Sequence, residues 1–398
     1  MPFPRAIHLA AALAGIAGMA STALSAVQDG PKYRLKNDVA ALAGAKTAGR
    51  GNGQPGLDRA MEYVAASYRD MGLEPEIQTF PYRLPNSTGH GPDGHLKNLA
   101  VKIKGTDAEL CSQHIVVGAH IDHLGTKAAL GGRQDVFHGA DDNASGSAAL
   151  MELTRHFHGD PPARSILFIH FSGEEWGMLG SRHWVANPTV DIESVPLMLN
   201  LDMVGRLKAQ NGLTLTTMGV GHDDIAKAVE LAPDGLKVVA DRGTSIFALA
   251  SDHVAFVEKN IPTLFLFTGV HADYHRTTDT VGKIDWDGLA TVTGYAKTLI
   301  AEYANAPQTP VFKPRGGLGA NFSQMARSAG LRAWRLEAGG VASRAGMKVG
   351  DILTHLGGYA VSTQKELEEA LDSLDRGDHV TIRWRRGVET MQADLELQ

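Results

Sequence analysis

Residues 164–175 read RSILFIHFSGEE, an apolar run that ends directly in the carboxylates of Glu174 and Glu175. A near-continuous apolar run of this length is typical of a strand that is buried on both faces, in a sheet with helices on each side. An acidic residue at the end of such a strand is costly to bury unless it has a partner. Three more near-continuous apolar runs of similar length lie at 114–121 (HIVVGAHI), 196–202 (PLMLNLD) and 262–268 (PTLFLFT).

Segments with helical spacing of apolar residues alternate with these strands. A further strand is predicted at 98–104, and helices are predicted at 57–73, 144–157, 178–186, 223–232 and 286–304. Such alternation is typical of parallel sheets, because a helix carries the chain back to the start of the next strand. We therefore predict an α/β fold, an open and mostly parallel sheet with helices on both faces.

The composition excludes several classes of protein. The chain has 398 residues, of which 43% are hydrophobic, and this is too apolar for a disordered chain. Its 38 Lys and Arg against 44 Asp and Glu give a net charge of −6, which argues against a nucleic-acid partner because such a protein needs a basic face. The single cysteine, Cys111, excludes a disulfide framework and a cysteine-rich zinc site. Any metal must therefore be held by His, Asp and Glu.

The first 26 residues have the layout of a secretory signal peptide. They carry one charge, Arg5, then an apolar run from Ile7 to Ala20, and small residues from Ala23 to Ala26 that offer a cleavage site. The run is about 14 residues long, whereas a membrane-spanning helix needs about 20. We expect an exported protein, periplasmic or secreted, whose mature chain has no membrane span.

Polar clusters lie where the predicted strands end. In open α/β sheets, ligand sites form beyond the carboxyl ends of the strands, so clusters from distant parts of the chain meet at one edge. Each cluster alone has an ordinary explanation, such as a helix N-cap for Asp142 or a solvated helix start for Glu174. Together they point to a shared function. The clusters are His120-Ile121-Asp122, Asp141-Asp142-Asn143, Glu174-Glu175, Asn200-Leu201-Asp202 and the segment from Tyr274 to Thr280.

The side chains of these clusters suit a two-metal hydrolytic site. Imidazole nitrogen and carboxylate oxygen are ligands that zinc accepts. Three carboxylates supply a charge of −3 against +4 from two Zn²⁺, and a bridging hydroxide brings the formal sum to zero. Water between two metals is acidic enough to act as a nucleophile near neutral pH. The predicted ligands are His120, Asp142, Glu175, Asp202 and His275.

Two further carboxylates have predicted roles beside the metals. Glu174 can take the proton of the attacking water and pass it to the leaving amine. Asp122, two residues after His120, can accept the other imidazole N–H of that histidine and so orient it. We therefore predict Glu174 and Asp122 as catalytic residues.

Five motifs, spread over about residues 55–305, resemble those of the co-catalytic di-zinc aminopeptidase family. This family includes secreted bacterial leucyl-type aminopeptidases, glutamate carboxypeptidase, glutaminyl cyclase and the inactive transferrin receptor. The motifs are AHIDHLG (119–125), GADDNASG (139–146), FSGEEWGMLGS (171–181), NLDMVG (200–205) and DYHRTTDT (273–280).

The resemblance implies a role for each predicted ligand. His120 and Asp202 match the residues that hold one zinc. Glu175 and His275 match those that hold the other, and Asp142 matches the ligand that bridges both.

The resemblance also assigns different roles to carboxylates that are adjacent in the sequence. Asp142 is preferred to Asp141 because the family ligand precedes x-x-Ser-Gly, which here is residues 143–146 (NASG). Glu174 matches the general base, and Asp122 matches the carboxylate that orients the first histidine.

Three further comparisons with the family leave these ligands unchanged. Ser251-Asp252-His253 resembles a segment near the family's site, although Ser251 or Asp252 could equally cap the next helix. The protease-associated insert of some members has no room before residue 98. The disulfide of some secreted members is forbidden by the single cysteine.

The C-terminal part of the chain is predicted to be a second, α+β domain after a Pro- and Gly-bearing linker at 306–319. GGLGANF (316–322) resembles the carboxylate loop of a PDZ domain, and VASRAGMKVGDIL (341–353) resembles the bacterial PDZ signature without its usual proline. In a PDZ domain, N–H groups of this loop hold a C-terminal carboxylate while the peptide adds as a strand, here beside a helix near 364–374. The predicted peptide-binding residues are Gly317, Leu318, Gly319 and Ala320.

The sequence thus predicts a signal peptide (1–26), a di-zinc peptidase domain (27–308) and a PDZ-like domain (309–398). The leading hypothesis is an exported zinc aminopeptidase with two Zn²⁺ per chain. It would bind peptides with a free N-terminus and hydrolyse the first peptide bond through a metal-bridged hydroxide. A peptide C-terminus would be a second partner, at the PDZ-like domain.

Three other functions stay open. A glutaminyl cyclase of the same fold uses one zinc and makes no hydrolysis product. A carboxypeptidase-type member would use basic residues such as Arg206 and Arg276 to recognise an acidic substrate. A catalytically dead member would act as a binding protein through its PDZ-like domain, although no predicted ligand or base is missing here.

Overall fold

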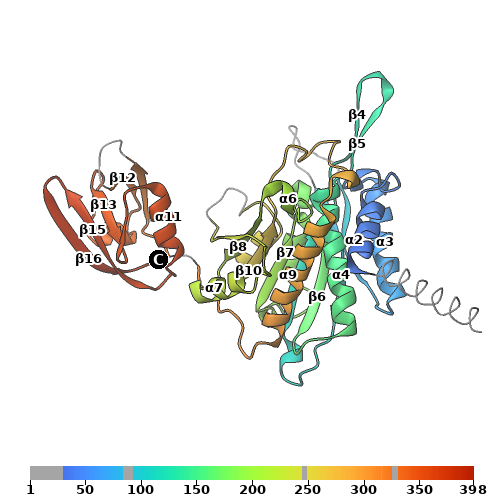
Figure 1. Ribbon diagram of the computed structural model, residues 1–398, viewed down its shortest axis with the longest axis horizontal. Helices are drawn as coiled ribbons and strands as arrows, with labels where there is room; N and C mark the ends of the chain where they lie inside the picture. Colours follow the sequence, from blue (N-terminus) through green and yellow to red (C-terminus); the bar gives the residue numbers. More distant parts are fainter. Residues whose placement is uncertain (1–29, 84–92, 244–248, 315, 325–329) are drawn as a thin grey trace, which may run out of the picture.

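The computed structural model describes residues 30–83, 93–243, 249–314, 316–324 and 330–398 (Figure 1). The predicted signal peptide, residues 1–26, lies outside the described residues. An eight-stranded sheet and a six-stranded sheet occupy successive parts of the chain. None of the helices in the described ranges is both long enough and apolar enough to cross a membrane.

The eight-stranded sheet has a parallel centre and antiparallel neighbours. Its order is β1 (Glu76–Arg83), β2 (Asp93–Ile103), β6 (Ser165–Phe171), β3 (His114–His120), β7 (Leu197–Leu201), β10 (Thr263–Phe267), β8 (Leu213–Met218) and β9 (Val238–Asp241). The four apolar runs seen in the sequence form β6, β3, β7 and β10, which are parallel to one another. The register pairs His120 with Phe171 and Gly118 with Asn200, so the carboxyl ends of β3, β6 and β7 lie side by side.

Helices cover both faces of this sheet. One face packs against α2 (Pro31–Leu42), α3 (Pro55–Asp70), α4 (Gly146–Gly159), α7 (His222–Glu230) and α9 (Trp286–Asn305). Helices α2, α4 and α9 contact one another in front of the sheet in Figure 1. The other face packs against α5 (Leu179–Ala186) and α8 (His253–Val257), where Trp184 and Phe256 stack with 5.5 Å between ring centroids. Burial on both faces explains why the central strands are continuously apolar.

The apolar pattern of the sequence predicts neither α2 nor β1, β8 and β9. Strand β8 reads LTLTTM, in which threonine interrupts the apolar run. Strand β9 lies at the sheet edge, where the side chain of Val239 is half exposed. Strands of this kind give no continuous apolar run, so the signal that identifies the centre of the sheet is too weak at its edges.

A two-stranded hairpin stands out from the body of the protein (Figure 1). It consists of β4 (Gly125–Ala128) and β5 (Gln134–Phe137), and Leu130 at its tip is almost fully exposed. The hairpin connects the turn after β3 to the segment that carries Asp142. The turn after β3 and the segment that carries Asp142 therefore both lie at the base of the hairpin.

The last part of the chain forms a small α+β domain with its own core, which includes Leu331, Leu353 and Trp384. Strand β11 lies at one edge of its sheet, and α11 starts with a capping box between Thr363 and Glu366. The elements are β11 (Ala320–Gln324), β12 (Leu331–Leu336), α10 (Val341–Arg344), β13 (Ile352–Leu356), β14 (Tyr359–Ala360), α11 (Gln364–Asp372), β15 (His379–Arg386) and β16 (Glu389–Glu396). Our domain boundary between residues 308 and 309 stays a prediction.

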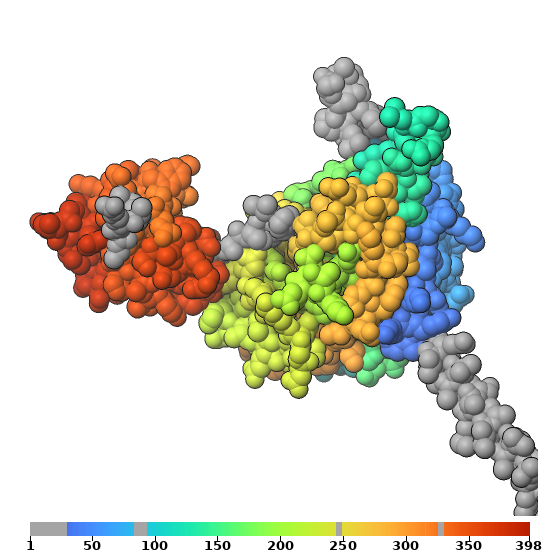
Figure 2. All heavy atoms as spheres, turned by 45° about the horizontal axis from the view of Figure 1, so that its top comes forward, coloured from blue at the N-terminus to red at the C-terminus, as the bar shows by residue number. Residues whose placement is uncertain are grey.

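The two domains meet through polar contacts. Arg242, directly after β9, donates hydrogen bonds to the carbonyl oxygens of Asp372 (2.9 Å) and Leu374 (2.8 Å) and forms an ion pair with Asp375. The N–H of Lys313 in the linker donates to the carbonyl oxygen of Gly219 (2.9 Å). Figure 2 shows the C-terminal lobe, in orange and red, against the yellow-green surface of the larger domain.

Candidate active site

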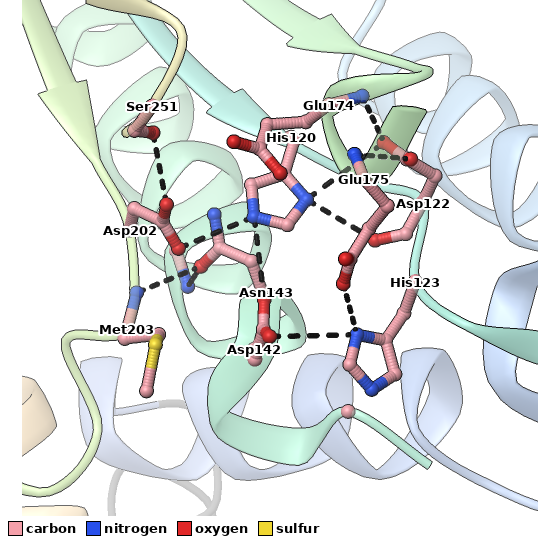
Figure 3. A network of polar contacts seen from close by, with 12 residues as sticks. His120, Asp122, His123, Asp142, Asn143, Glu174, Glu175, Asp202, Met203 and Ser251 are labelled. Atoms are coloured by element: carbon pink, nitrogen blue, oxygen red, sulfur yellow. Dashed lines mark hydrogen bonds and ion pairs between the residues drawn. The ribbon is translucent and has the colours of Figure 1, made fainter. Parts of the chain in front are cut away.

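The predicted motifs meet at the carboxyl edge of the eight-stranded sheet, and Figure 3 labels residues from the first four of them. Strand β3 ends at His120, β6 leads to Glu174 and Glu175, and β7 leads to Asp202. His275 lies in the segment after β10. The register of the parallel strands therefore brings side chains from distant parts of the sequence to one place.

His120, Asp142 and Asp202 form a first group of candidate metal ligands. His120 Nε2 lies 3.2 Å from Asp202 Oδ1 and 3.4 Å from Asp142 Oδ1, and all three residues are buried. The hydroxyl of Ser251 donates to Asp202 Oδ2 (2.8 Å), and the amide of Asn200 donates to Ser251 Oγ (2.8 Å). Ser251 thus fixes the carboxylate of Asp202, and Asp252, at the N-cap of α8, makes no side-chain cap there.

Asp142 also belongs to a second group, with Glu175, His275 and His123. Its Oδ2 lies 3.2 Å from His275 Nε2, and Glu175 Oε2 lies 3.1 Å from the same nitrogen. His123 Nδ1 lies 2.7 Å from Glu175 Oε1 and 3.6 Å from Asp142 Oδ2. The two groups share Asp142 through a different oxygen each, as a bridging carboxylate would require.

The donor set of both groups fits a metal. Within the described residues, no Lys or Arg side chain forms an ion pair with Asp142, Glu175 or Asp202. Asp142 Oδ2 is buried without a hydrogen-bond partner there. A buried carboxylate is costly unless a cation neutralises it, and a set of nitrogen and oxygen donors without thiolate suits zinc.

The histidines and carboxylates of the two groups shift one another's pKa. Burial raises the pKa of Asp142, but His123, His120 and His275 outweigh burial and hold it well below its usual range. Burial lowers the pKa of His275, but Asp142 and Glu175 together raise it to about 10. In the metal-free protein His120 and His275 therefore favour the charged form, and a metal must displace their protons.

Glu174 stands beside the first group without belonging to it. The turn that carries it starts at Gly173, whose φ of 77° and close contact with a leucine side chain require glycine. Burial raises the pKa of Glu174 well above its usual range, and the charges of Asp202 and Asp252 add to this rise. Burial also raises the pKa of Asp252 to about 7. A carboxyl with a raised pKa can return the proton that it takes.

Asp122 holds the turn of the two glutamates by its side chain. Its Oδ1 and Oδ2 accept the backbone N–H of Glu174 and Glu175, each at 3.2 Å, and Oδ2 also accepts from the amide of Asn52 (2.6 Å). His120 Nδ1 lies 3.1 Å from the backbone carbonyl oxygen of Asp122 but 3.7 Å from its Oδ1. The main chain of Asp122 is therefore the nearer partner of the His120 ring.

The adjacent Asp141 has other partners than Asp142. Its Oδ1 accepts the N–H of Gly205 (2.7 Å), and its Oδ2 lies 3.1 Å from His271 Nε2. Asp279 Oδ2 accepts the N–H groups of both Asp141 (2.9 Å) and Asp142 (3.1 Å). Asp141 and Asp279 thus fix the loop, and only the side chain of Asp142 faces the histidines of both groups.

A buried arginine braces the backbone around the site. Arg50 has no exposed surface and donates to the carbonyl oxygens of Ile121, His138 and Gly139, each at 2.8 Å. Burial lowers its pKa to about 10, and the charge of Asp142 opposes this shift. Arg50 thereby links the end of β3 to the segment before Asp142.

A pocket lies next to both groups of ligands. Met203, Phe265 and Phe267 form an apolar cluster in its wall, and Val270 and Tyr274 are partly exposed. Such a wall suits an apolar side chain. The lining residues are His120, Asp142, Glu174, Asp202, Met203, Ala250, Phe265, Phe267, Val270, Tyr274 and His275.

The predicted carboxylate loop of the C-terminal domain is held by its own backbone. The carbonyl oxygen of Leu318 accepts the N–H of Ala342 (2.8 Å), and Gly319 adopts a φ of 60°. The N–H of Gly317 donates to the carbonyl oxygen of Gln398 (2.8 Å) and is therefore engaged within the domain. Ala320 begins β11, the edge strand.

The structure brings all five predicted ligands and Glu174 together, but sequence reasoning missed two residues. His123 directly follows the predicted Asp122, so its place in AHIDHLG was a signal that could have been used. Arg50 lies far from every motif in the sequence and carried no signal.

Curated relatives of this chain include peptidases. Leucine aminopeptidase 2 of Trichophyton rubrum is 27% identical over 252 residues, which cover 55% of this chain and 47% of the relative. Leupeptin-inactivating enzyme 1 of Streptomyces exfoliatus is 28% identical over 283 residues, which cover 68% of this chain and 57% of the relative. The chain thus spans about half the length of the curated relatives that it matches.

Solved structures share the fold at lower identity. A zinc aminopeptidase from Bacillus subtilis is 17% identical with a TM-score of 0.57, over 71% of this chain and 98% of that chain. Porphyromonas gingivalis glutaminyl cyclase is 19% identical with a TM-score of 0.54, over 68% of this chain and 98% of that chain.

Two protein families match successive parts of the sequence. A PDZ domain matches residues 316–397, which hold the six-stranded sheet. Peptidase family M28 matches residues 98–300, just over half of the chain, and this range contains both groups of candidate ligands. The chain is therefore a member of peptidase family M28 that carries a PDZ domain after its peptidase domain.

Proposed function

We propose that this protein is an exported zinc-dependent aminopeptidase that holds two Zn²⁺ and removes N-terminal residues from peptides. The observation that carries the proposal is the pair of ligand groups that share Asp142 through one oxygen each. The names of the curated relatives, leucine aminopeptidases among them, support the same class of reaction.

The residues around the ligand groups have separate roles in this reaction. Zinc, when bound, acidifies water and polarises a carbonyl oxygen. Glu174 accepts a proton from the attacking water and delivers it to the leaving amine, which its raised pKa favours. Asp122 keeps Glu174 in place through the backbone N–H that it accepts.

The pocket favours substrates with an apolar N-terminal residue. Met203, Phe265 and Phe267 form the apolar part of its wall, directly beside the ligand Asp202. A leucine-sized side chain would bury apolar surface there, whereas a charged side chain would lose its hydration without a partner.

Hydrolysis of aminoacyl-p-nitroanilides by the purified, zinc-loaded full chain tests this function. We expect leucyl-p-nitroanilide to be hydrolysed, a chelator to abolish hydrolysis, and N-acetyl-leucyl-p-nitroanilide to resist it. Glu174→Gln should lower kcat by about 10²- to 10⁴-fold with its zinc retained, as expected for loss of a general base. The matched control Glu193→Gln alters an exposed glutamate and should change nothing. Equal hydrolysis of the blocked substrate, or full activity of Glu174→Gln, would contradict the proposal.

A glutaminyl cyclase is the second candidate, because one of the similar structures has that activity. The second ligand group favours the peptidase, since it provides for two metals. One zinc per chain, with cyclisation of N-terminal glutamine and no release of p-nitroaniline, would support the cyclase.

The remaining alternatives have less support. Arg206, a candidate for recognising an acidic substrate, lies 3.2 Å from Asp273 in an ion pair, and Arg276 is exposed. A catalytically dead binding protein would be expected to lack a ligand or the base, and the chain retains all of them.

Export and peptide capture are further parts of the proposal. The layout of residues 1–26 supports export, and mass spectrometry of the protein from the periplasm or medium should find a chain that starts near residue 27. The edge position of β11 supports capture of a peptide C-terminus as an added strand. Gly319→Asp should abolish such binding, and unchanged binding of C-terminal peptides would remove this part of the proposal.

A further inference from the structure

His123 lies in the second ligand group, although its role was not predicted. Its side chain is buried in the turn after β3, and Nδ1 lies 2.7 Å from Glu175 Oε1 and 3.6 Å from Asp142 Oδ2 (Figure 3). Its Nε2 is buried without a hydrogen-bond partner among the described residues. The ring therefore interacts with the site through Nδ1.

The alternative is that His123 only donates a hydrogen bond to Glu175. One N–H on Nδ1 can point at only one oxygen, whereas Nδ1 faces carboxylates of both Asp142 and Glu175. His275 Nε2 faces the same two carboxylates, at 3.2 and 3.1 Å, and the two rings meet edge to face with 5.8 Å between centroids. A metal bound between these groups would take the place of the ring N–H protons. Two ring lone pairs and two carboxylate oxygens that converge in this way form a set of metal ligands.

The two ligand groups differ in number. The first offers three side chains, and the second offers four, whose ligand atoms all lie within 4.8 Å of one another. Zinc with four protein ligands is closed, whereas catalytic zinc keeps one position open for water or substrate.

We propose that His123 Nδ1 is a fourth protein ligand of the second metal, beside Asp142, Glu175 and His275. The second position then has one more protein ligand than the first, so we expect it to retain its metal more tightly. The first group, His120, Asp142 and Asp202, lies beside Glu174 in the pocket. This inference rests on the proposed two-zinc centre.

The test compares His123→Ala with wild-type full chain, both made metal-free and titrated with Zn²⁺ against a competing chelator. A residue that merely orients a ligand weakens metal binding by about 10- to 100-fold, so loss of a ligand should weaken binding of one zinc by more than about 100-fold. The other zinc should bind with nearly unchanged affinity. Added imidazole should restore part of the lost affinity. His158→Ala, at the exposed end of α4, is the matched control and should bind zinc as the wild type does.

X-ray absorption of the zinc-loaded wild type gives a second readout that does not depend on a variant. We expect three imidazoles over two zinc ions, whereas two imidazoles would overturn the inference even if His123→Ala fails to fold. Unchanged affinity of folded His123→Ala for both zinc ions would overturn it as well. A wild type that binds no zinc would instead overturn the proposed function, so the two failures are distinguishable.

Discussion

Buried charges have different surroundings in the two domains. In the PDZ domain, the carboxylate of Asp351 accepts two hydrogen bonds from the guanidinium of Arg386, at 2.9 and 2.8 Å. At the edge of the peptidase sheet, Asp142 and Asp202 face histidine nitrogens and other carboxylates. A carboxylate paired with arginine is neutralised by a permanent charge of the fold. Carboxylates that meet only histidines, as these do in the described residues, can exchange the histidine protons for a bound metal. The comparison distinguishes a charge that stabilises the fold, at Asp351, from charges that serve a reaction, at Asp142 and Asp202.

Removal of the shared carboxylate should have the largest effect. Asp142→Asn takes one ligand from both groups, so we expect the loss of both zinc ions and a fall in kcat/KM of at least about 10³-fold, since zinc contributes several kcal/mol to transition-state stabilisation. Metal analysis and p-nitroanilide kinetics measure both. Asp135→Asn, on the exposed strand β5, is the control. If Asp142→Asn keeps two zinc ions, the contrast between the two domains fails, because Asp142 would then have a structural role like that of Asp351.

Removal of a paired charge should act on stability and spare the chemistry. Arg242 and Asp375 are nearly buried between the two domains, and breaking such a pair costs about 3–5 kcal/mol. We expect Arg242→Met to lower the melting temperature and to separate the unfolding of the two domains in calorimetry, with p-nitroanilide hydrolysis unchanged. Arg182→Met breaks an exposed pair with Glu258 and should cost about 1 kcal/mol or less. An equal effect of both variants would show that burial of the Arg242 pair contributes nothing.

Two histidines of the peptidase domain should respond to pH with opposite signs. Burial lowers the pKa of His170 to about 3, where its ring contacts the Tyr68 hydroxyl (2.8 Å) in the core. As pH falls from about 6.5 towards 3, the unfolded chain takes up a proton that the folded chain refuses, so the free energy of unfolding falls by at most about 1.4 kcal/mol per pH unit. His275, whose pKa is raised to about 10, stabilises the metal-free fold below pH 6.5 and loses this contribution as pH rises towards 10.

Urea unfolding of the metal-free protein from pH 4 to 9 measures both contributions. His170→Gln should flatten the dependence on the acid side, and His275→Gln should flatten it on the alkaline side. The same slope in the wild type and His170→Gln would mean that His170 is not buried as a neutral ring.

The centre of the fold could be predicted from the sequence, and its edges could not. The central strands are buried on both faces, so their apolar runs are unbroken. Their alternation with helices can therefore be recognised in the sequence. Strand β8 alternates threonine with apolar residues over six positions, and β9 has four residues and exposes Val239, so both give a weaker signal than the unbroken apolar runs. The amphipathic helix α3 was visible because one face is apolar, while the apolar and polar residues of α2 separate less clearly onto opposite faces.

The candidate ligands could be predicted because most of them lie at or just after the end of an apolar strand, whereas their contacts could not be predicted. The sequence places Asp122 beside His120, but only the folded turn shows that its carboxylate accepts the N–H groups of Glu174 and Glu175. Arg50 acts through backbone carbonyl oxygens, which leave no trace in the sequence. The choice of Asp142 over Asp141 came from family resemblance, and the physical reason is the different partners that the fold gives them.

Titration of the metal-free full chain with Zn²⁺ tests the central claim most directly, with zinc bound per chain and leucyl-p-nitroanilide hydrolysis followed together. The two ligand groups predict two zinc ions per chain and activity that appears as they bind. Saturation at one zinc or none, or hydrolysis that does not depend on zinc, would contradict the assignment of these carboxylates and histidines to a two-metal active site.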